Sequence, residues 1–257
     1  TINSGSSSLK ASLFLANGER KNYRYEHIDD NRAKNHASAF NTLLNQVCAD
    51  LPKNEKLVIG HRFVHGGDIA DAARIIDADE RARLESIPHL APLHMPSNLL
   101  GVYLCNTHLA AQREVVQIAC FDTAFHAGLP EIAYRLPIPQ YLGIRRFGFH
   151  GLNYAHITQC LPHLLGETAK GHIVLAHLGS GASLCLLENM RSIDTTMGYT
   201  AAGGIPMGTR SGDLDPGVMV ELAQRFDHKT LTAMTYQQMG LLALSNGESS
   251  EMSELVT

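Results

Sequence analysis

The chain has 257 residues, of which 44% are apolar and 18% are charged, and its 21 basic and 25 acidic side chains give a formal net charge of -4. This composition excludes a disordered chain, a collagen-like repeat and a coiled coil. The absence of a basic surplus argues against a nucleic-acid-binding protein, and no apolar run approaches the ~18 residues that span a bilayer. The length predicts about two domains.

The cysteines are widely spaced, odd in number and without a C-x-x-C pair. With no secretory signal visible, this pattern predicts small core side chains in a reducing compartment, not a disulfide framework. We therefore expect a cytoplasmic protein. The residues concerned are Cys48, Cys105, Cys120, Cys160 and Cys185.

Strands are predicted from apolar runs in the first half of the chain. They cover residues 9–15, 57–64 and 115–121. Asn17-Gly18 is typical of a hairpin turn after the first of them. The last is followed at once by Asp122, so a carboxylate is expected at the end of a buried strand.

Helices are predicted between these strands. Apolar residues at three- and four-residue steps predict a helix over residues 37–51 that ends before Pro52. Asp77 or Asp79 can cap a short helix that ends near residue 87. Pro96 suits the first turn of another helix. The apolar residues singled out on that helix are Leu99, Leu100, Tyr103 and Leu104.

The second half repeats this pattern. Strands are expected over residues 173–178, 184–187 and 192–197, and Asp215-Pro216 begins a helix that reaches about residue 226. Ser249-Ser250, followed by two glutamates, indicates one more helix start. Because the chain begins without Met and stops as that helix begins, we expect an internal piece of a longer protein. We place the domains at 1–122 and 123–257.

Two loops of small residues resemble each other. Gly5-Ser6-Ser7-Ser8-Leu9 and Gly179-Ser180-Gly181-Ala182-Ser183-Leu184 each follow a predicted strand and lead into a second one. The repetition predicts duplicated α/β domains that face each other across a cleft. Loops of this kind offer backbone N–H groups and hydroxyls that suit phosphate oxygens, although each alone is also typical of an ordinary tight turn.

Other nucleotide-binding signatures are absent from the sequence. It contains no G-x-x-x-x-G-K-[ST] motif and no G-x-G-x-x-G after a strand, and the H-R-D set of protein kinases is missing. The sequence therefore excludes a P-loop enzyme and a protein kinase.

Polar clusters lie at predicted strand ends or in loops, where α/β proteins bind ligands. A zinc site from His61, His65, His94 and Asp122 is one interpretation, but the H-E-x-x-H pattern is absent. The clusters are His61-Arg62-Phe63-Val64-His65-Gly66-Gly67, Pro92-Leu93-His94-Met95-Pro96, Phe121-Asp122-Thr123-Ala124-Phe125-His126, Gly148-Phe149-His150-Gly151 and Met207-Gly208-Thr209-Arg210-Ser211-Gly212-Asp213.

Arg62 and Arg210 are the most informative residues in these clusters. Arg62 lies within a predicted strand and Arg210 lies between glycines, and an arginine is costly to bury in either place without an anionic partner. The partner is either a structural carboxylate or an anionic ligand. The local sequence leaves both alternatives open.

The segment Ile2-Asn3-Ser4-Gly5-Ser6-Ser7-Ser8-Leu9-Lys10 resembles the opening motif of the acetokinase family. The clusters above, which contain Arg62, His94, Asp122, His150 and Arg210, resemble further motifs of that family in the same order. His177-Leu178-Gly179-Ser180-Gly181-Ala182-Ser183 and Asp194-Thr195-Thr196-Met197-Gly198 are also similar. The resemblance extends over essentially the whole chain.

The resemblance implies a fold and a reaction. The fold is α/β, with two duplicated ribonuclease H-like domains of the acetate and sugar kinase/heat-shock chaperone/actin superfamily, the second of them incomplete here. The reaction is reversible transfer of the ATP γ-phosphoryl group to acetate or another short-chain carboxylate, with Mg²⁺, to give ADP and an acyl phosphate. The implied partners are ATP or ADP and the carboxylate, with no nucleic acid or membrane, in a homodimer.

The resemblance also implies catalytic roles at matching positions. Arg62 and Arg210 would flank the transferring phosphoryl group and the carboxylate, and His150 would hydrogen-bond the phosphoryl oxygens. Asp122 would orient an arginine or the Mg²⁺ shell. Because a carboxylate is already ionised at pH 7, no general base is needed, and positioned cations would supply most of the catalysis.

Binding roles are implied in the same way. The residues on the phosphate side of the first domain are Ser6, Ser8 and Lys10, with Asn3 at the metal. Those at the nucleotide phosphates in the second are His177, Gly179, Ser180 and Gly181. Val64, Leu93 and Ala201 would line the substrate pocket, and His94 would support the site.

The sequence departs from the family pattern at several points. Ser180 stands where the family usually has Asn, and Ala201-Ala202-Gly203-Gly204 stands for the usual Pro-Leu-Glu-Gly. The family continues beyond residue 257 with an adenine pocket, a metal-linked Glu and a closing helix. A propionate or butyrate kinase, a sugar kinase with Asp122 as base, and an actin-like ATPase module remain alternatives.

Overall fold

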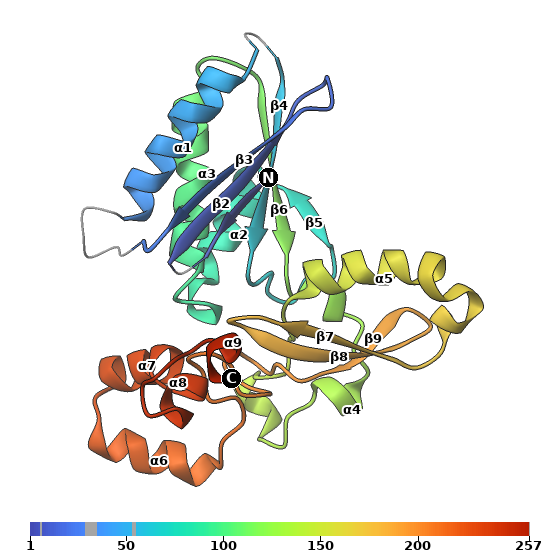
Figure 1. Ribbon diagram of the computed structural model, residues 1–257, viewed down its shortest axis with the longest axis vertical. Coiled ribbons are helices and arrows are strands. Elements are labelled where there is room, and N and C mark those ends of the chain that lie inside the picture. Colours follow the sequence, from blue (N-terminus) through green and yellow to red (C-terminus); the bar gives the residue numbers. More distant parts are fainter. Residues whose placement is uncertain (6, 29–34, 53–54, 257) are drawn as a thin grey trace. The chain divides into compact units, whose positions relative to one another are not determined.

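The computed structural model describes residues 1–5, 7–28, 35–52 and 55–256. The chain folds into two compact units, Thr1–Ala124 and Phe125–Thr257 (Figure 1). Ser6, which the sequence predicted at the phosphate side, lies outside the described residues.

The first unit is built on a sheet with the order β3-β2-β1-β4-β6-β5 in its described part. Strands β1, β2 and β3 form an antiparallel meander, and β1 pairs in parallel with β4, which pairs in parallel with β6. Strand β5 pairs antiparallel with β6. The bounds are β1 Ile2–Ser4, β2 Ser8–Phe14, β3 Arg20–Glu26, β4 Leu57–Phe63, β5 Ala73–Ile75 and β6 Val115–Phe121.

The helices of this unit begin at good caps. Helix α1 (His36–Asp50) has a capping box in which Asn35 and Ser38 bond each other's backbone, and α2 (Ala78–Ser86) is capped by Asp77. Helix α3 (Met95–Leu109) has Pro96 in its first turn, as predicted. A short 3₁₀ helix over Pro88–Leu90 precedes α3.

Helices α1 and α3 pack together against one face of the sheet (Figure 1). Gly101 of α3 makes this close packing possible, because a Cβ there would lie 2.6 Å from the Phe40 ring of α1. The buried core consists mainly of Ile2, Leu9, Phe40, Leu43, Leu44, Ile59, Cys105 and Leu109. Burying these side chains supplies most of the stability of the unit.

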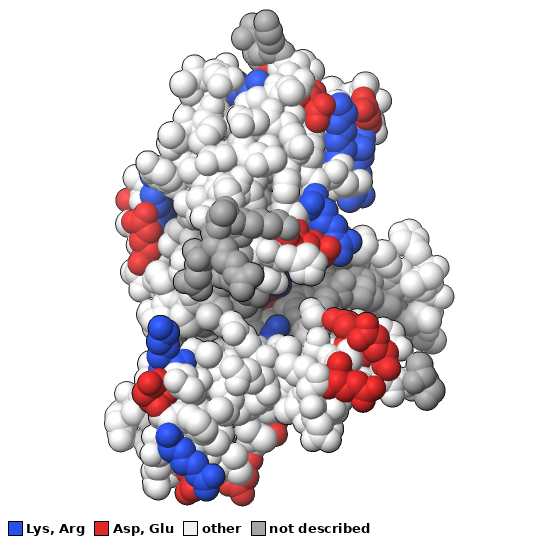
Figure 2. All heavy atoms as spheres, turned by 60° about the vertical axis from the view of Figure 1, so that its left-hand side comes forward, with Lys and Arg blue, Asp and Glu red and all other residues white. Residues whose placement is uncertain are grey.

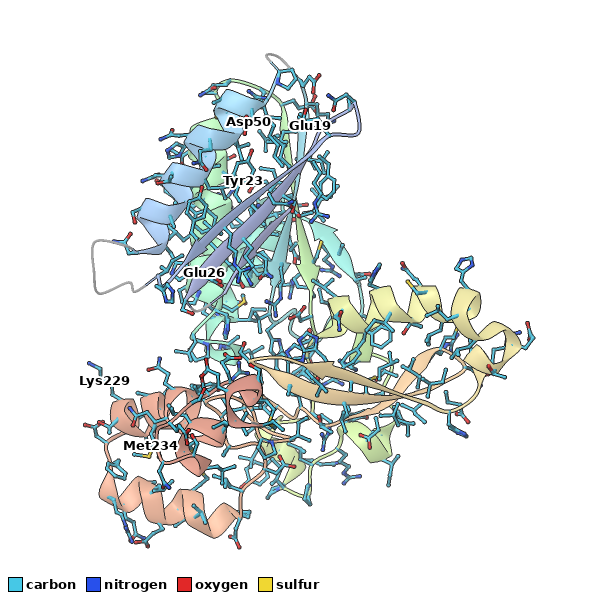
Figure 3. All side chains as sticks on the ribbon, in the orientation of Figure 1. Glu19, Tyr23, Glu26, Asp50, Lys229 and Met234 are labelled. Carbon is cyan, nitrogen blue, oxygen red and sulfur yellow. The ribbon has the colours of Figure 1, made fainter. Side chains whose placement is uncertain are left out.

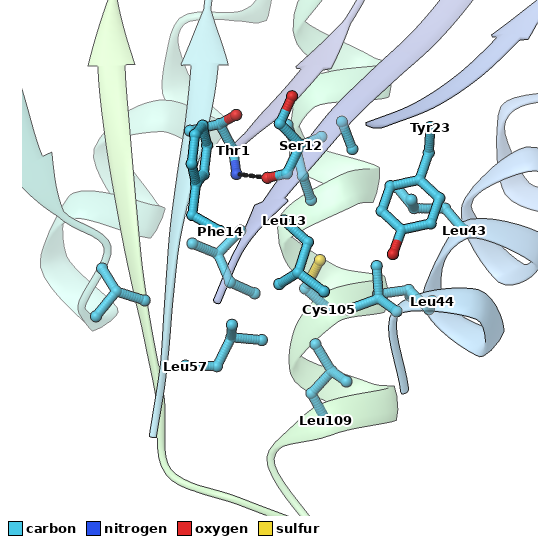
Figure 4. Close-up of a pocket in the computed structure, with 15 residues that line it drawn as sticks. Thr1, Ser12, Leu13, Phe14, Tyr23, Leu43, Leu44, Leu57, Cys105 and Leu109 are labelled. Atoms are coloured by element: carbon cyan, nitrogen blue, oxygen red, sulfur yellow. Dashed lines mark hydrogen bonds between the residues drawn. The ribbon is translucent and has the colours of Figure 1, made fainter. Parts of the chain in front are cut away.

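The core of the first unit contains a cavity of about 140 Å³ beside Thr1 (Figure 4). The Thr1 amino group donates to the Ser12 carbonyl oxygen at 2.8 Å at its rim. Apolar side chains line most of the cavity, among them Leu13, Leu44, Val47, Leu57, Cys105 and Leu109.

Polar contacts join β3 to α1 on the same unit. The Tyr23 hydroxyl donates to Asp50 Oδ2 at 2.6 Å, and Lys21 Nζ donates to Asp50 Oδ1 at 2.6 Å. Figure 3 shows Tyr23 on β3 and Asp50 at the end of α1. The polar strand β3 was not singled out in the sequence, except through the Asn17-Gly18 turn that leads into it.

The second unit contains an antiparallel sheet with the order β7-β8-β9 in its described part. Helix α5 (Gly151–Leu165) packs on it, and Tyr154 and Leu161 of that helix share a buried cluster with Leu175, Cys185 and Leu187. The strands are β7 Ile173–Leu178, β8 Ala182–Glu188 and β9 Arg191–Thr195. On β7, Val174 and Leu178 are 63% and 74% exposed.

The remaining elements of this unit are helical. Helix α6 begins at the predicted Asp215-Pro216 pair, with Asp215 accepting from the Gly217 N–H. The helices are α4 Glu131–Tyr134, α6 Pro216–Arg225, α7 His228–Gln237, α8 Gly240–Leu244 and α9 Met252–Leu255. Short 3₁₀ helices cover Ala124–His126, Gln140–Leu142 and Gly166–Lys170.

The two loops that resemble each other occupy equivalent places. One joins β1 to β2 and the other joins β7 to β8, and in each case a third antiparallel strand follows. This repetition of the opening meander agrees with the predicted duplication.

The surface and the helices add two observations. On the face that Figure 2 shows, acidic and basic side chains are interspersed in small groups. Among the residues that the structure describes, every helix is too short or too polar to cross a bilayer.

Candidate active site

Arg62 and Asp122 meet at the end of two parallel strands of the first unit. Asp122 follows β6, and its N–H donates to the Phe63 carbonyl of β4 at 3.0 Å, which fixes the register there. Arg62 donates to Asp122 Oδ2 from Nε at 3.0 Å and from Nη2 at 2.5 Å. Its third nitrogen, Nη1, donates to Asn3 Oδ1 at 3.0 Å.

The Arg62 guanidinium is thus held from two sides and remains charged. Burial alone would lower the pKa of Arg62, but the Asp122 charge and hydrogen bonds raise it, and the net direction is upward. Asp122 is only 2% exposed, whereas the Arg62 side chain is 29% exposed. An oriented cation that reaches solvent in this way is suited to bind an anion.

The turn between β1 and β2 is fixed by side chains from two helices. His36 Nε2 of α1 bonds the Gly5 carbonyl at 2.8 Å, and Asn98 Nδ2 of α3 donates to the Ser4 carbonyl at 3.0 Å. Both side chains are 2% exposed. The sequence did not single out either residue, because these contacts link positions 31 and 94 residues apart.

The other predicted residues of the first unit lie around this turn or after β4. Lys10 is exposed and pairs with Asn3 across β1 and β2, and the Ser8 carbonyl accepts from the Gly5 N–H at 2.8 Å. Val64 is buried, whereas Leu93 and His94 are half-buried, with His94 at the N-cap of α3. The predicted pocket wall of Val64, Leu93 and Ala201 includes residues from both units.

His150 lies at the start of α5 in the second unit, with a left-handed backbone of φ 62°. Its Nδ1 is 2.8 Å from Ser183 Oγ of β8. Its ring stacks on that of His177 at a centroid distance of 3.9 Å, with an interplanar angle of 17°. Non-glycine residues with positive φ concentrate at functional sites, because the strain needs surrounding support.

The loop between β7 and β8 lies close to two basic side chains. A Cβ on Gly181 would be 3.2 Å from His150 Nε2 and 3.5 Å from Arg210 Nη2. Glycine therefore keeps open the space in which both side chains end. The Ser180 carbonyl accepts from the Gly208 N–H at 3.3 Å, which joins this loop to the segment that contains Arg210.

Arg210 is anchored through its own segment. Arg210 Nη1 donates to the Ala201 carbonyl at 2.7 Å, and the Gly204 N–H donates to Asp213 Oδ1 at 2.7 Å. The structure therefore brings together four predicted site residues of the second unit, His150, His177, Gly181 and Arg210. Gly179 and Ser180 lie in the same turn and are exposed.

The model of the acetokinase family matches residues 14–257. The chain belongs to the acetokinase family.

Relatives within the family are similar over nearly the whole chain. It is 39% identical over 284 residues to an acetate kinase of Nitrobacter hamburgensis, covering 99% of the chain and 69% of that relative. It is 38% identical over 274 residues to a propionate kinase of Edwardsiella piscicida, covering 98% of the chain and 67% of that relative.

Solved structures of the family confirm the predicted fold class. A propionate kinase of Francisella tularensis superposes with a TM-score of 0.82 at 27% identity, covering 99% of the chain and 71% of that structure. An acetate kinase of Entamoeba histolytica gives a TM-score of 0.81 at 27% identity, covering 99% and 69%.

The described residues contain no group of three or more His, Cys, Asp or Glu side chains that could hold a metal ion. The zinc interpretation therefore has no support, since His61 bonds Gln117 at 2.8 Å instead. Asn3, the residue predicted at the metal, accepts a hydrogen bond from the Arg62 cation on its amide oxygen.

Proposed function

We propose that this chain catalyses reversible transfer of the ATP γ-phosphoryl group to acetate or a related short-chain carboxylate, giving ADP and an acyl phosphate. The observation that supports this most directly is the Arg62 guanidinium, held by Asp122 and Asn3 while its side chain remains partly exposed. Membership of a family whose relatives include acetate and propionate kinases supports the same reaction.

The chemistry explains why cations matter more than a base. Both reactants are anions, and the carboxylate needs no deprotonation, so the barrier arises from bringing negative charges together. Arg62 in the first unit and Arg210 in the second are proposed to neutralise charge that develops on the phosphoryl group and the carboxylate. His150 is proposed to donate from Nε2 to a phosphoryl oxygen.

Binding of the nucleotide phosphates is assigned to both glycine- and serine-containing turns. In the second unit, Gly179, Ser180 and Gly181 are proposed to approach the phosphates, and in the first unit Ser8 and Lys10 are proposed to do so. The turns suit this role because their backbone N–H groups and hydroxyls can approach phosphate oxygens. Val64, Leu93 and Ala201 are proposed to contact the carbon chain of the acid, with His94 and His177 as supporting residues.

Mg²⁺ fits this set of residues only in part. In ATP-using enzymes Mg²⁺ usually keeps several waters and is bound by one or two carboxylates together with substrate phosphates. The two hydrogen bonds from Arg62 to Asp122 both end on Oδ2, which leaves Oδ1 as the carboxylate oxygen for a hydrated ion. When bound, Mg²⁺ would neutralise phosphate charge. The expected homodimer and cytoplasmic location stay predictions.

A sugar kinase is less well supported than a carboxylate kinase. Such an enzyme needs a carboxylate base to deprotonate a hydroxyl. Asp122 is the candidate, but its Oδ2 already accepts two hydrogen bonds from the Arg62 cation and is therefore occupied. An ATPase module without an acceptor leaves Arg62 and Arg210 without a carboxylate to bind.

Hydroxamate trapping of acyl phosphate tests the proposal. The protein is incubated with ATP, Mg²⁺ and acetate, propionate, butyrate or a hexose, and ATP hydrolysis without acceptor is measured in parallel. Trapped acyl phosphate with a short acid, and no product with the hexose, supports a carboxylate kinase. Hexose phosphorylation, or hydrolysis that no acid changes, would contradict it.

A further inference from the structure

The second unit contains a buried chain of hydrogen bonds that ends on His150. The Tyr154 hydroxyl lies 2.6 Å from Ser183 Oγ and 2.8 Å from the Ser183 carbonyl oxygen. Ser183 Oγ in turn lies 2.8 Å from His150 Nδ1. In this relay of Tyr154, Ser183 and His150, the first two residues are completely buried and therefore shielded from water.

The anchor of the relay is rigid. The Tyr154 ring belongs to the core under β7 and β8 and lies edge-on to His126, with ring centroids 5.7 Å apart. Burial raises the pKa of the Tyr154 phenol, so it stays protonated and able to donate at neutral pH. Tyr154 is fully buried and reaches the partly exposed His150 through Ser183, so it is well placed to fix the orientation of that ring.

We propose that Tyr154 and Ser183 are positioning residues that hold His150 through Nδ1, so that Nε2–H is presented at Gly181. The inference rests on the proposed function of His150 as a donor to the phosphoryl group. Which ring nitrogen faces a ligand is set by the hydrogen bond that the other nitrogen makes. Here Nδ1 is engaged by Ser183, and Nε2 lies 3.2 Å from the Cβ position of Gly181.

The relay can serve both protonation states of His150. For the neutral ring, Tyr154 donates to Ser183 Oγ, and Ser183 donates to Nδ1, which places the proton on Nε2. For the doubly protonated ring, Nδ1–H donates to Ser183 Oγ, Ser183 donates to Tyr154, and Tyr154 donates to the Ser183 carbonyl oxygen. In each case Nε2–H remains a donor, because only hydroxyl protons change direction.

The His177 ring, stacked on that of His150, also restricts movement of the His150 ring perpendicular to its plane. Asn153 Nδ2 donates to His177 Nδ1 at 2.9 Å, so His177 in its neutral form bears its proton on Nε2. A neutral ring under His150 tolerates a positive charge on His150, whereas a second cation there would repel it. Asn153 and Tyr154 are neighbours on the first turns of α5, so one helix controls both imidazoles.

The kinetic test uses Tyr154→Phe and Ser183→Ala, with Tyr23→Phe as a matched control. Tyr23→Phe also removes a hydroxyl that makes a partly buried hydrogen bond, here to Asp50, but Tyr23 lies on β3 of the first unit. We expect Tyr154→Phe and Ser183→Ala each to lower kcat about tenfold, with little change in KM for ATP. Tyr23→Phe should stay within about twofold of the parent.

A double-mutant cycle separates positioning from general loss of structure. In a His150→Ala background, Tyr154→Phe should have almost no further effect on kcat, because its effect passes through the missing ring. A tenfold effect that persists in that background overturns the proposal, as does a folded Tyr154→Phe whose kcat matches Tyr23→Phe.

Nitrogen-15 NMR of the histidine rings tests the relay without activity. The His150 signals are assigned by their loss in His150→Ala, and we expect Ser183→Ala to shift the Nδ1 resonance. An unchanged His150 spectrum in Ser183→Ala would overturn the relay. If the parent protein forms no acyl phosphate, the proposed function fails by itself, and the NMR result still decides the relay.

Discussion

Asp122 accepts two hydrogen bonds from Arg62 on a single carboxylate oxygen, Oδ2, at 3.0 Å and 2.5 Å. The pair connects the end of β6 to β4. The third guanidinium nitrogen, Nη1, donates to Asn3 Oδ1. Arg62 therefore cannot turn away from the edge of the sheet where the β1–β2 turn lies.

The arginines are expected to dominate catalysis. Arg62→Ala and Arg210→Ala should each lower kcat by about 10²–10³, because each removes a cation that is proposed to stabilise the transition state. The surface pair of Arg225 and Glu221 provides a control, since Arg225→Ala breaks an exposed contact within α6 and should leave kcat unchanged. Steady-state acyl phosphate formation measures both. An Arg62→Ala enzyme within a few-fold of the parent contradicts the role.

Asp122→Asn keeps the size of the side chain and removes its charge. We expect kcat to fall and the Mg²⁺ dependence to change, because the amide holds Arg62 less tightly and offers the ion no carboxylate. The measurement is kcat as a function of Mg²⁺ concentration, together with a melting curve. A shift in melting temperature with unaltered kinetics would show that Asp122 is only structural.

The stability of the first unit should decrease in mild acid because of His61. Burial lowers the pKa of His61 to about 4, against 6.5 for the free side chain, while the bond to Gln117 acts in the opposite direction. Above pH 6.5 the ring is neutral in both states; as the pH falls from 6.5 to 4, only the unfolded chain gains the proton. The free energy of unfolding should fall by up to about 3 kcal/mol over this range.

Denaturant unfolding of the parent and of His61→Gln at pH 7 and pH 4.5 tests this expectation. The glutamine can bond Gln117 but does not titrate, so the variant should show a weaker pH dependence than the parent. Equal pH dependence in the two proteins would show that His61 is not the group responsible.

Ala201 is expected to influence the choice of acid. Ala201 is proposed to line the acid pocket, and the resemblance to the family pattern implies proline at this position. The absence of the ring carbons would then leave room for about one more methylene, worth ~0.8 kcal/mol. The chain should therefore accept propionate better than its Ala201→Pro variant does, by roughly fourfold in the propionate/acetate ratio of kcat/KM. Proline retains the carbonyl that Arg210 bonds. An unchanged or higher ratio in Ala201→Pro rejects the idea.

We expect His36 to position the β1–β2 turn through the hydrogen bond from its Nε2 to the Gly5 carbonyl. His36→Gln places an amide nitrogen near the position of Nε2 and should retain most of the activity, whereas His36→Leu leaves the Gly5 carbonyl without this donor. We expect His36→Leu to lower kcat/KM for ATP about threefold to tenfold. If Gln and Leu behave alike, the contact does not position the turn.

The sequence predicted those elements whose causes are local. Residues 115–121 and 173–178 coincide with β6 and β7, and the Asp215-Pro216 pair begins α6, because apolar runs and caps act over a few residues. The buried face of α3 was harder to foresee. Tyr103 is 61% exposed, while Gly101 faces Phe40, because close packing between helices favours a small residue that hydropathy does not reward.

The residue types of the candidate site were predictable from the sequence, but the contacts between those residues were not. Arg62 and Asp122 were both singled out, but their pairing follows from the parallel register of β4 and β6, which joins residues 60 positions apart. The contact of Tyr154 with Ser183 spans 29 positions and depends on α5 packing over the sheet. No local pattern contains that information.

Strand β7 has a consequence for how the isolated chain behaves at high concentration. It is the outer strand of the β7-β8-β9 sheet in the described residues, and Val174 and Leu178 expose their side chains on it. An outer strand with apolar side chains is a template on which another chain can add a strand. Concentrated samples should therefore form soluble clusters before they precipitate, and Val174→Lys should delay the onset of light scattering.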